Sequence, residues 1–503
     1  MNLKIITPNQ SEYEAWNNRG VNLRFSSQPS EIIPVTTTEE LTNALQYAVD
    51  KDYRVAIRGG GHCLENFVNN PEVNIIIDIS KMKGIRYDQD MNAIEIKAGT
   101  TLGEMYETLY KQWGTVLPCG EHPAVGIGGH IQGGAFGFLC RQHGLGADYL
   151  YAVEVLWVNK NRQVEKLIAT SEPSDKNREL WWAHTGGGAG NFGAVTRYWF
   201  CKPGAVSKEP SDLLPKAPSI IETIELEWQW KDINENNFRQ LVDNYCNWCF
   251  NNARPKTKTC NLYATLHLWN KIMGKIQLKG LLTEPTDGVV DDFIQSLNNE
   301  LNAFCTIKRN KTSWLDFALH PFPDVFSGPK AAFKVKDAFL CQPFTHQRIK
   351  TIYHYLTEYE DVPGGNLGLA TYGGQVNSIA SDATASVQRN AILGTACAVG
   401  WLDPTDEAKS MEWVRKCYSD LYRKTGGVPV PGKQTGGCII AHPDNDIADP
   451  NWNKSGLPWH TFYYQDNYSR LKKIKATWDA LNIFRHSLSV EPNRTDTFIG
   501  LKY

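Results

Sequence analysis

The sequence predicts an α+β protein with more than one domain. Its first third alternates strand-like and helix-like segments, its 503 residues exceed one ordinary domain, and a Pro-rich stretch divides the chain. Apolar residues make up 42% and charged residues 21%, which is typical of a globular protein and excludes a disordered or coiled-coil chain. We expect domains over residues 1–210 and 211–445, followed by a C-terminal segment over residues 446–503.

Hydrophobic periodicity predicts the elements of the first domain. Short apolar or alternating runs indicate strands over residues 53–57, 74–79, 93–99 and 195–200, and helical spacing indicates helices over residues 37–51 and 102–113. The first helix is expected to begin at Thr37, because Thr37 and Glu40 form the Thr-x-x-Glu pattern of an N-terminal cap.

A linker is predicted over residues 202–218, where Pro, Gly and Ser cluster. Beyond it, strands are expected over residues 222–230 and 275–282, with a helix over residues 235–252 between them. The C-terminal segment contains a Lys/Arg-rich amphipathic helix over residues 468–481.

Charge and composition exclude several kinds of partner. The chain carries 52 Lys and Arg against 54 Asp and Glu, so it has no basic field that would attract nucleic acid. No run approaches the roughly 20 apolar residues of a membrane helix, and the N-terminus lacks the apolar stretch of a signal peptide. The 12 cysteines show no framework spacing and are expected to be free thiols. We therefore expect a cytoplasmic protein that binds neither membrane nor nucleic acid.

Two glycine-rich segments follow predicted elements of the first domain. Arg58, three glycines and His62 come directly after the strand over residues 53–57, and successive glycine N–H groups can form a nest for an anion such as a pyrophosphate. A tight turn with a surface histidine would account for this segment equally well. Residues 120–137 contain seven glycines in eighteen positions, which excludes a stable helix and indicates backbone that follows an extended ligand.

A third segment, residues 181–196, contains the spacing G-x-G-x-x-G at Gly188, Gly190 and Gly193. The dinucleotide-binding fingerprint needs a strand before it and a helix after it, whereas here the order is reversed. We reject a Rossmann NAD site on that ground. An FAD site in a different fold remains open.

Other motifs are less informative. Cys246 and Cys249 have the spacing of half a zinc site, but a helix with two buried cysteines accounts for them without a metal, and we expect none. The motif His442-Pro443-Asp444-Asn445-Asp446 could indicate a metal site or an acid–base pair, and a Pro-Asp turn explains its spacing equally well. The chain has no G-x-S-x-G and no P-loop, so a hydrolase or a kinase is not supported.

These motifs together resemble the vanillyl-alcohol-oxidase superfamily, specifically its berberine-bridge-enzyme-like branch. The glycine segments resemble the family's cofactor loops, and residues 463–484 resemble its C-terminal Y-Y-x-x-N-x-x-R-L motif. Within the branch, residues 371–377 and 478–489 are most similar to bacterial oxidases that act on sugars of glycosylated natural products.

The resemblance implies the fold and the cofactor. It implies a PCMH-type FAD-binding domain of two α/β subdomains over residues 1–210 and a substrate domain whose antiparallel sheet is covered by helices. The C-terminal segment would return to the FAD domain. FAD would be bound covalently through His62. The implied cofactor-binding residues are Arg58, Gly59, Gly60, Gly61, His62, Val125, Gly126, Gly128, Gly129, His130, Gly133, Gly134, Gly137, Gly193, Val195, Tyr464 and Asn467.

Departures from the family pattern refine these expectations. Bicovalent members have a cysteine where this chain has His122, so no 6-S-cysteinyl link is expected, and Cys119 lies three residues too early to replace it. Two family tyrosines are replaced by Ile439 and His442, and a third by Phe136. Loss of these phenols predicts a more apolar substrate site. The expected substrate-binding residues are Phe136, Tyr372, Ile439 and Tyr463.

The implied reaction moves a hydride from an alcohol to flavin N5 while a base takes the hydroxyl proton. His442 occupies the place of the family's tyrosine base, and an imidazole titrates near neutral pH. His122 is the second candidate and Tyr372 the third, as base or as substrate clamp. Valine at position 125 is associated in the family with oxygen access, which favours an oxidase with O2 as acceptor.

Three functions are therefore considered. The first is an FAD-linked oxidase of an alcohol on a sugar or specialised metabolite. The second is a different oxidation by the same flavin, such as ring closure or amine dehydrogenation. The third is a binding or cyclising scaffold with a structural FAD. Substrate-dependent bleaching of the flavin separates the third from the others.

Overall fold

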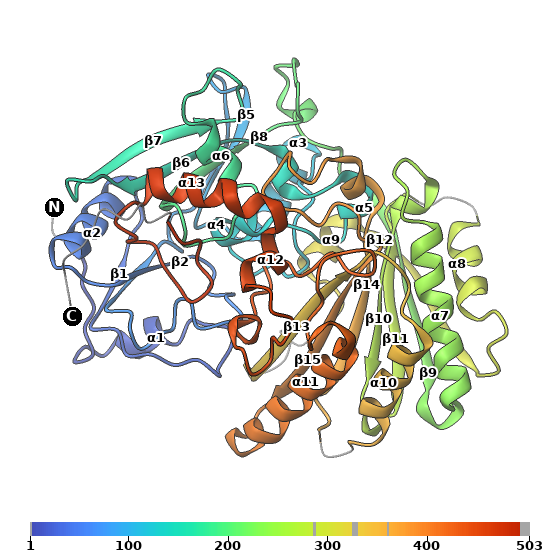
Figure 1. Ribbon diagram of the computed structural model, residues 1–503. Helices are drawn as coiled ribbons and strands as arrows, with labels where there is room; N and C mark the ends of the chain where they lie inside the picture. The colour runs from blue at the N-terminus through green and yellow to red at the C-terminus, as the bar shows by residue number, and fades with distance from the viewer. Residues whose placement is uncertain (1–2, 285–287, 324–329, 360–361, 493–503) are drawn as a thin grey trace.

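The computed structural model describes residues 3–284, 288–323, 330–359 and 362–492. Its strands form three sheets (Figure 1). The two smaller sheets use strands between Glu31 and Phe200, and the large sheet uses strands between Ile220 and Trp401. The predicted boundary near residue 210 falls between these two sets. We call the part before it the first half, residues 211–445 the second half, and the part after residue 445 the C-terminal segment.

The first small sheet is parallel and lies in the order β1-β3-β2. Its strands are β1 (Glu31–Pro34), β2 (Val55–Arg58) and β3 (Ile75–Asp78). The central strand β3 is buried along its whole length, which explains its continuous apolar run. Helix α1 (Tyr13–Asn17) contacts β1, and α2 (Thr38–Asp50) contacts β3. The predicted cap is confirmed, because the Thr37 side chain accepts a hydrogen bond from the Glu40 N–H.

The second small sheet is antiparallel and lies in the order β4-β5-β8-β6-β7. Its strands are β4 (Ile85–Asp88), β5 (Ala93–Lys97), β6 (Leu150–Val158), β7 (Val164–Thr170) and β8 (Ala194–Phe200). The helices around it are α3 (Leu102–Trp113), α4 (Ile127–His130), α5 (Cys140–His143) and α6 (Arg178–Ala183). The G-x-G-x-x-G segment lies between α6 and β8, so the helix-before-strand order predicted from the sequence is confirmed.

The segment over residues 120–137 differs from the expectation that it contains no helix. It includes the single turn α4 and a short 3-10 turn over Ile131–Gly133. Gly128 lies within this turn, and a β-carbon there would come within 2.6 Å of the Ala98 carbonyl oxygen. The turn persists because it packs against the neighbouring strand, which compensates for the poor helix propensity of glycine.

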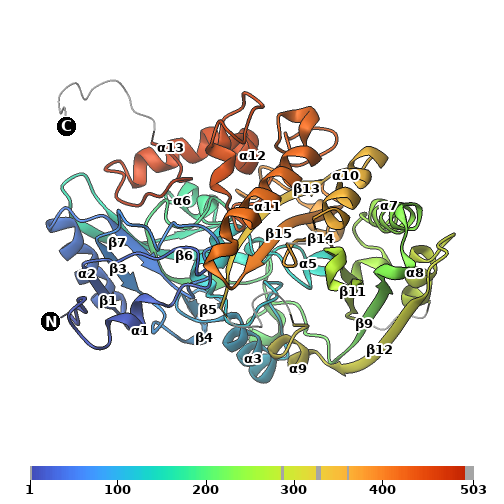
Figure 2. The same ribbon diagram turned by 90° about the horizontal axis from the view of Figure 1, so that it is seen from below.

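The large sheet is antiparallel and lies in the order β12-β9-β11-β10-β14-β15-β13. Its strands are β9 (Ile220–Gln229), β10 (Leu262–Trp269), β11 (Lys275–Leu282), β12 (Cys305–Ser313), β13 (Ala332–Leu340), β14 (Asn366–Thr371) and β15 (Leu393–Trp401). Figure 2 shows α7 (Glu235–Asn251), α10 (His346–Thr357) and α11 (Glu407–Leu421) over one face of this sheet. The remaining helices of this half are α8 (Val289–Leu297), which packs on α7, and α9 (Trp314–Leu319), which packs on α3. The expected antiparallel sheet covered by helices is therefore confirmed.

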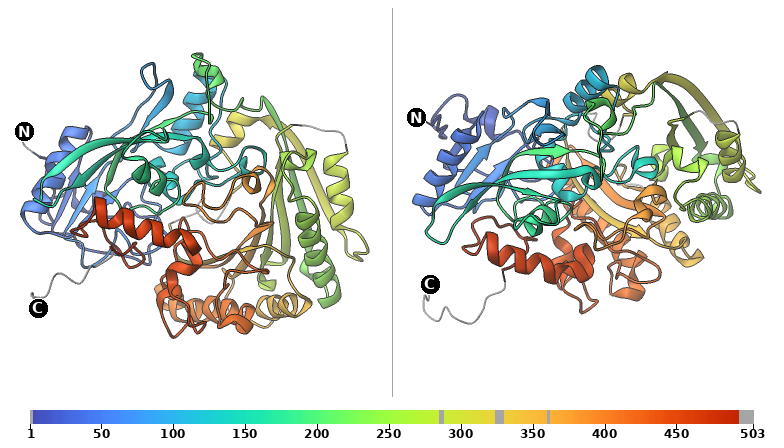
Figure 3. Two further views of the ribbon diagram at one scale, coloured as in Figure 1. Left: turned by 45° about the horizontal axis from the view of Figure 1, so that its top comes forward. Right: turned by 90° about the horizontal axis from the view of Figure 1, so that it is seen from above.

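The C-terminal segment crosses back to the first half. Helices α12 (Trp459–Tyr464) and α13 (Tyr468–Trp478) lie beside its strands, as Figure 3 shows for the red α13. The buried Lys475 ammonium donates hydrogen bonds to the Asn191 carbonyl at 2.7 Å and to Asp479 at 2.6 Å. Helix α13 ends at Trp478, three residues before the predicted end, because Asp479 turns back to accept the N–H groups of Ile483 and Phe484.

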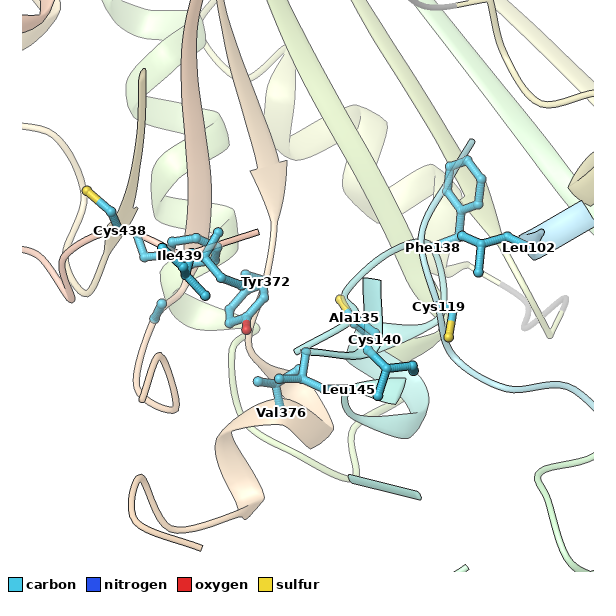
Figure 4. Packing of buried hydrophobic residues seen from close by; sticks show 14 of the residues in the cluster. Leu102, Cys119, Ala135, Phe138, Cys140, Leu145, Tyr372, Val376, Cys438 and Ile439 are labelled. Carbon is cyan, nitrogen blue, oxygen red and sulfur yellow. The ribbon is translucent and has the colours of Figure 1, made fainter. Parts of the chain in front are cut away.

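One continuous apolar core joins the two halves. Figure 4 shows part of it, with Tyr372, Val376 and Ile439 from the second half near Ala135 and Leu145 from the first. Cys246 and Cys249 belong to this core, so their interpretation as two buried cysteines on a helix is confirmed. None of the described helices combines the length and the apolar character needed to cross a bilayer.

Candidate active site

A cavity of about 540 Å³ lies where the two halves meet. One wall consists of the glycine-rich segments of the first half, and the opposite wall is the face of the large sheet that α7, α10 and α11 leave uncovered. The glycine wall includes the predicted residues Arg58, Gly59, Gly60, Gly61, His62, His122, Val125, Gly126, Gly129, His130, Gly133 and Phe136. The sheet side includes Tyr372 and His442. The fold thus brings together residues that are up to 384 positions apart in the chain.

The glycines of this wall serve two different purposes. A β-carbon on Gly60 would lie 2.3 Å from the Gly126 nitrogen, so these two glycines let the loops pack backbone against backbone. Gly59 and Gly129 are different, since a β-carbon on either would meet no protein atom within 4 Å, and both line the cavity. Their lack of a side chain therefore leaves room for a ligand that approaches the backbone closely.

His62 and His122 form a pair at the cavity wall, with ring centroids 5.1 Å apart. The Nδ1 atom of His122 accepts the backbone N–H of Ala124 at 3.2 Å, which fixes the orientation of this ring. Cys119 is buried outside the cavity lining, and burial strongly raises its pKa. Cys63, beside His62, does line the cavity, and burial raises the pKa of its thiol to about 11. Both thiols are therefore held in the protonated, weakly nucleophilic form.

The guanidinium of Arg58 is engaged by the protein rather than by a ligand phosphate. It is buried and donates to Asp78 at 2.7 Å and to the Trp16 carbonyl at 2.6 Å. Arg58 therefore fixes the strand that precedes the triple-glycine loop, and a ligand on this side would meet mainly backbone groups. His130 is also oriented internally, because its Nε2 accepts the Gly120 N–H at 2.9 Å, and burial lowers its pKa to about 4.

The opposite wall exposes one side of each strand, as strand alternation requires. Its floor is made of small side chains from β14 and β15, among them Gly368, Ala370 and Ala396. Rings and longer side chains surround this floor, including Tyr263, Trp269, Phe322 and Phe339. The shape suits a flat or bulky organic molecule laid over the sheet.

His442 lies where this floor meets the glycine wall. A β-carbon on Gly133 would come within 2.9 Å of the Ala441 side chain, so Gly133 allows the segment that carries His442 to approach the glycine wall. The imidazole packs edge-on against Phe136, with centroids 5.4 Å apart, and its side chain is 33% exposed. Burial lowers the pKa of His442 to about 4, so the ring is neutral at pH 7.

Tyr372 lies across Phe136 from His442, with its ring 6.3 Å from that of Phe136. Its hydroxyl is buried and has no hydrogen-bond partner among the described residues. Burial raises the pKa of Tyr372 well above its ordinary value, so the phenol stays protonated. A protonated phenol can donate a hydrogen bond to a ligand but cannot serve as a base at neutral pH.

The remaining predicted residues lie behind the cavity wall. Gly128, Gly137 and Gly193 permit close packing within the first half, and Val195 pairs with Val155 in the sheet. Gly134 permits the close approach of Ser386 from the second half. Ile439 is buried, and the hydroxyl of Tyr463 accepts the Asp444 N–H at 2.9 Å. In the C-terminal segment, the Tyr464 hydroxyl donates to the Gly187 carbonyl and Asn467 donates to the Thr384 carbonyl. These contacts support the wall and place none of the residues at its surface.

Several cavity residues were missed by the sequence motifs. Asp337 and Phe339 come from β13, His267 and Trp269 from β10, and His486 from the C-terminal segment. They stand in ordinary strand or loop patterns, and no motif singles them out. Only the alternation of β13, which puts Val335, Asp337 and Phe339 on one face, could have indicated a shared surface.

Comparison with known proteins agrees with this geometry. An FAD binding domain matches residues 29–161, and a "Berberine and berberine like" domain matches residues 442–491. The aclacinomycin-N/aclacinomycin-A oxidase of Streptomyces galilaeus is 40% identical over 477 residues, which cover 94% of this chain and 87% of that protein. The chain belongs to the berberine-bridge-enzyme-like family of FAD-linked oxidoreductases.

Solved structures of family members superpose closely. Aclacinomycin oxidoreductase gives a TM-score of 0.95 at 39% identity, covering 98% of this chain and 100% of that one. A glycopeptide hexose oxidase in complex with teicoplanin gives 0.93 at 38% identity, covering 98% of this chain and 99% of that one. The hexose oxidase of Chondrus crispus is 29% identical over 94% of this chain and 92% of its own length. The family and the PCMH-type FAD-binding fold expected from the sequence are confirmed.

FAD fits the glycine wall. Gly59 and Gly129 leave space at the backbone, and His62 lies on the same wall. These features, and the match of the FAD binding domain to residues 29–161, make the glycine wall suitable for holding FAD.

Proposed function

We propose that this chain is an FAD-dependent oxidase that oxidises an alcohol of a sugar or of a sugar-bearing specialised metabolite. The single observation that carries the proposal is the position of His442. A neutral imidazole stands between the glycine wall and the sheet floor, within reach of a substrate held between them. Relatives named as oxidases of aclacinomycin and of hexoses support the substrate class.

In the proposed reaction, the substrate hydroxyl gives its proton to His442 as the carbonyl forms. When bound on the glycine wall, FAD would supply the acceptor for the hydride of the carbinol carbon and a route for both electrons to O2, which would yield hydrogen peroxide. An imidazole whose pKa is lowered is unprotonated at pH 7 and so is ready to accept a proton. We assign Tyr372 the role of donating a hydrogen bond to a substrate oxygen, because its hydroxyl is protonated and has no partner among the described residues.

The covalent attachment of FAD is assigned to His62, and no second link through sulfur is expected. His62 follows the triple-glycine loop and lines the cavity. His122 stands beside it with Nδ1 already engaged as an acceptor, so it would pack against the cofactor edge. Val125 lines the same wall, and its small side chain fits access of O2 to the flavin.

Phe136 sets the character of the substrate site. Its ring packs edge-on against those of His442, Tyr372 and Phe339. Since a phenylalanine offers no hydrogen bond here, we expect selection by ring stacking and shape to exceed selection by polar contacts.

The experiment that tests the function begins with the visible spectrum of the purified holoenzyme before and after acid precipitation. A yellow pellet indicates covalent FAD, and His62→Ala is expected to leave the flavin in the supernatant. Flavin that still precipitates with the His62→Ala protein would contradict the assigned link. The same holoenzyme is then mixed without oxygen with aclacinomycin A and with D-glucose.

Bleaching of the flavin by either probe, followed by hydrogen peroxide on admission of air, is the expected result. A product two hydrogens lighter with a new carbonyl identifies alcohol oxidation. A product that instead contains a new ring bond would favour oxidative cyclisation. Flavin that neither probe nor a wider set of glycosides reduces would favour the non-redox scaffold.

A further inference from the structure

Strand β13 carries a buried carboxylate that the function described so far does not use. Asp337 lies on the cavity face of the strand, between Val335 and Phe339, and its side chain is 2% exposed. One oxygen, Oδ2, accepts the Ile439 N–H at 3.3 Å. The other, Oδ1, is buried without a hydrogen-bond partner among the described residues. A buried carboxylate in this state lowers stability, so its presence calls for another role.

The neighbour of this carboxylate is His442. Oδ2 of Asp337 lies 3.8 Å from Nδ1 of His442. That distance is too long for a direct hydrogen bond but within reach of one after a small side-chain rotation, and catalytic contacts commonly shorten when substrate binds. The His442 side chain is 33% exposed and can reach a substrate in the cavity, whereas the Asp337 side chain is 2% exposed and can act only through His442.

We propose that Asp337 is the positioning residue for His442: it accepts the proton on Nδ1, which leaves Nε2 as the basic atom that faces the substrate. This inference rests on the proposed function. The carboxylate would fix the tautomer and orientation of the imidazole, and it would stabilise the imidazolium that forms when the substrate proton arrives.

The proton balance of this pair is simple. In the active form, Asp337 is an anion and His442 is neutral with its proton on Nδ1. Transfer of the substrate hydroxyl proton to Nε2 breaks the O–H bond and gives an imidazolium beside a carboxylate. The proton leaves to solvent after the product departs. The two groups titrate together, so the active form appears above one apparent pKa that belongs to the pair.

The other titratable groups near Asp337 and His442 either have pKa values shifted away from neutral pH by burial or are paired with groups of opposite charge. Burial raises the pKa of Cys438, Tyr418, Tyr463 and Tyr372, and burial lowers that of His130 to about 4. The charge of Asp444 adds to burial in raising the pKa of Asp337, but Asp444 is itself paired with Lys334 at 2.7 Å and with Lys336 at 2.5 Å. His62 is the facing imidazole on the glycine wall, and it would be alkylated by the flavin in the holoenzyme proposed above.

The test uses two readouts on the holoenzyme. The first is ¹⁵N NMR of the histidine side chains between about pH 5 and 9, with His442→Phe used to assign the His442 signals. We expect the neutral Nδ1–H tautomer of His442 at pH 7 and above. In Asp337→Asn we expect part of the population to shift to the Nε2–H tautomer, because the carboxylate that accepts the Nδ1 proton is gone. An unchanged tautomer in Asp337→Asn would overturn the proposal.

The second readout is the rate of flavin reduction by whichever probe bleaches the flavin. Asp337→Asn is expected to slow the limiting rate at least about tenfold and to abolish its rise with pH. Since Asp337 acts through His442, adding Asp337→Asn to His442→Phe is expected to slow flavin reduction only slightly beyond the rate of His442→Phe alone. Asp446→Asn is the matched control, a buried carboxylate on the same loop as His442 that is paired with Lys336 and Arg415 and should leave the pH profile of reduction in place.

The outcomes separate the proposed function from the role of Asp337. If the flavin of His442→Phe is reduced by substrate at the wild-type rate, the assignment of His442 as the base under the proposed function is wrong. Suppose that His442→Phe slows flavin reduction, and that Asp337→Asn slows it by the same factor whether or not His442 is present. The assignment of His442 as the base is then kept, and the role of Asp337 is overturned. If Asp337→Asn only weakens substrate binding and leaves the limiting rate unchanged, Asp337 binds the substrate, and the proposal is likewise overturned.

Discussion

The two faces of strand β13 carry buried charges in opposite circumstances. On the face away from the cavity, Lys334 and Lys336 meet the carboxylates of Glu65, Asp444 and Asp446. On the cavity face, Asp337 has an oxygen without a partner among the described residues and a neutral histidine for a neighbour. Lys336 and Asp337 are therefore neighbours on one strand, but the charge of the first is paired with carboxylates and the second has no partner of opposite charge in the described part of the chain.

The paired face is a structural junction. Glu65 comes from the first half, the lysines from β13, and Asp446 from the loop that carries His442. Arg415 on α11 adds two hydrogen bonds to Asp446, at 3.0 and 2.8 Å. These cations and anions together fix the His442 loop to both halves. Buried charges that are completely paired therefore hold the fold, whereas a buried charge without full pairing lies at the candidate catalytic base.

The largest expected effect comes from breaking the paired face. Lys336→Met should leave Asp444 and Asp446 undercompensated in the interior and lower the free energy of unfolding by about 3–5 kcal/mol. Denaturant unfolding of the holoenzyme measures this. Adding Asp446→Asn to Lys336→Met should recover part of the loss, because one uncompensated charge is removed. A Lys336→Met protein as stable as wild type would show that the cluster does not hold the fold.

The next effect falls on the cavity face. His442→Phe should slow flavin reduction at least about tenfold, equivalent to about 1.4 kcal/mol of activation free energy. Its free energy of unfolding should stay close to that of wild type, because His442 packs mainly through its ring against Phe136. Stopped-flow reduction and denaturant unfolding on the same preparation separate the two quantities. If His442→Phe lost stability but kept the wild-type rate of flavin reduction, His442 would belong to the structural network rather than to the chemistry of the cavity face.

The pH dependence of stability should have opposite signs for the two faces. Burial alone would raise the pKa of Asp446, but the charge of Lys336 and the hydrogen bond from Arg415 hold it far below its ordinary value. Asp446 therefore contributes stability that is present above pH of about 4 and is lost as pH falls further. Burial raises the pKa of Asp337, so its contribution is full below about pH 4 and is lost as pH rises.

Two matched substitutions test this sign difference. At pH 7, Asp446→Asn should lower the midpoint of thermal unfolding. Asp337→Asn should leave this midpoint unchanged or raise it, with a gain of at most about 1 kcal/mol in the free energy of unfolding. The Asp337→Asn difference should shrink as pH falls toward 4, whereas the Asp446→Asn difference should begin to shrink only below about pH 4. A large destabilisation by Asp337→Asn at pH 7 would show that this carboxylate is part of the structural network after all.

The smallest effect is expected at the surface. Lys416 pairs with Glu412 one turn away on α11, and both side chains are more than half exposed. Lys416→Met removes the same kind of group as Lys336→Met but should leave the thermal midpoint unchanged within error, because exposed pairs are screened by solvent. A loss comparable to that of Lys336→Met would mean that burial does not account for the strength of the paired face.

The elements were largely predictable. Strands β5 and β11 and helices α2 and α3 follow local periodicity and capping, and the structure reproduces their positions to within about two residues. The end of α13 was less predictable, since Asp479 is held by Lys475, whose buried ammonium also donates to the Asn191 carbonyl in a distant loop. Local patterns fix an element's type, but distant contacts decide where it stops.

The cavity was predictable from one side. The glycine wall was located by its motifs, because seven glycines within eighteen residues indicate backbone that a ligand can approach closely. The sheet wall was not, since Asp337, Trp269 and Phe339 sit singly in strands that look like many others. Within the glycine motifs, the sequence also could not separate Gly59, which leaves space for a ligand, from Gly137, whose β-carbon would come within 2.1 Å of the Cys119 carbonyl oxygen.

The family, the FAD-binding half and the replacement of two family tyrosines by Ile439 and His442 could be predicted without any coordinates. These are properties of contiguous residues, and local chemistry encodes them. Two relations arise from the fold alone: His442 faces the cavity while Ile439 is buried behind it, and Asp337 lies 3.8 Å from His442 across 105 positions of the chain. Strand alternation and long-range packing set those relations, and no local pattern records which distant residue will meet which.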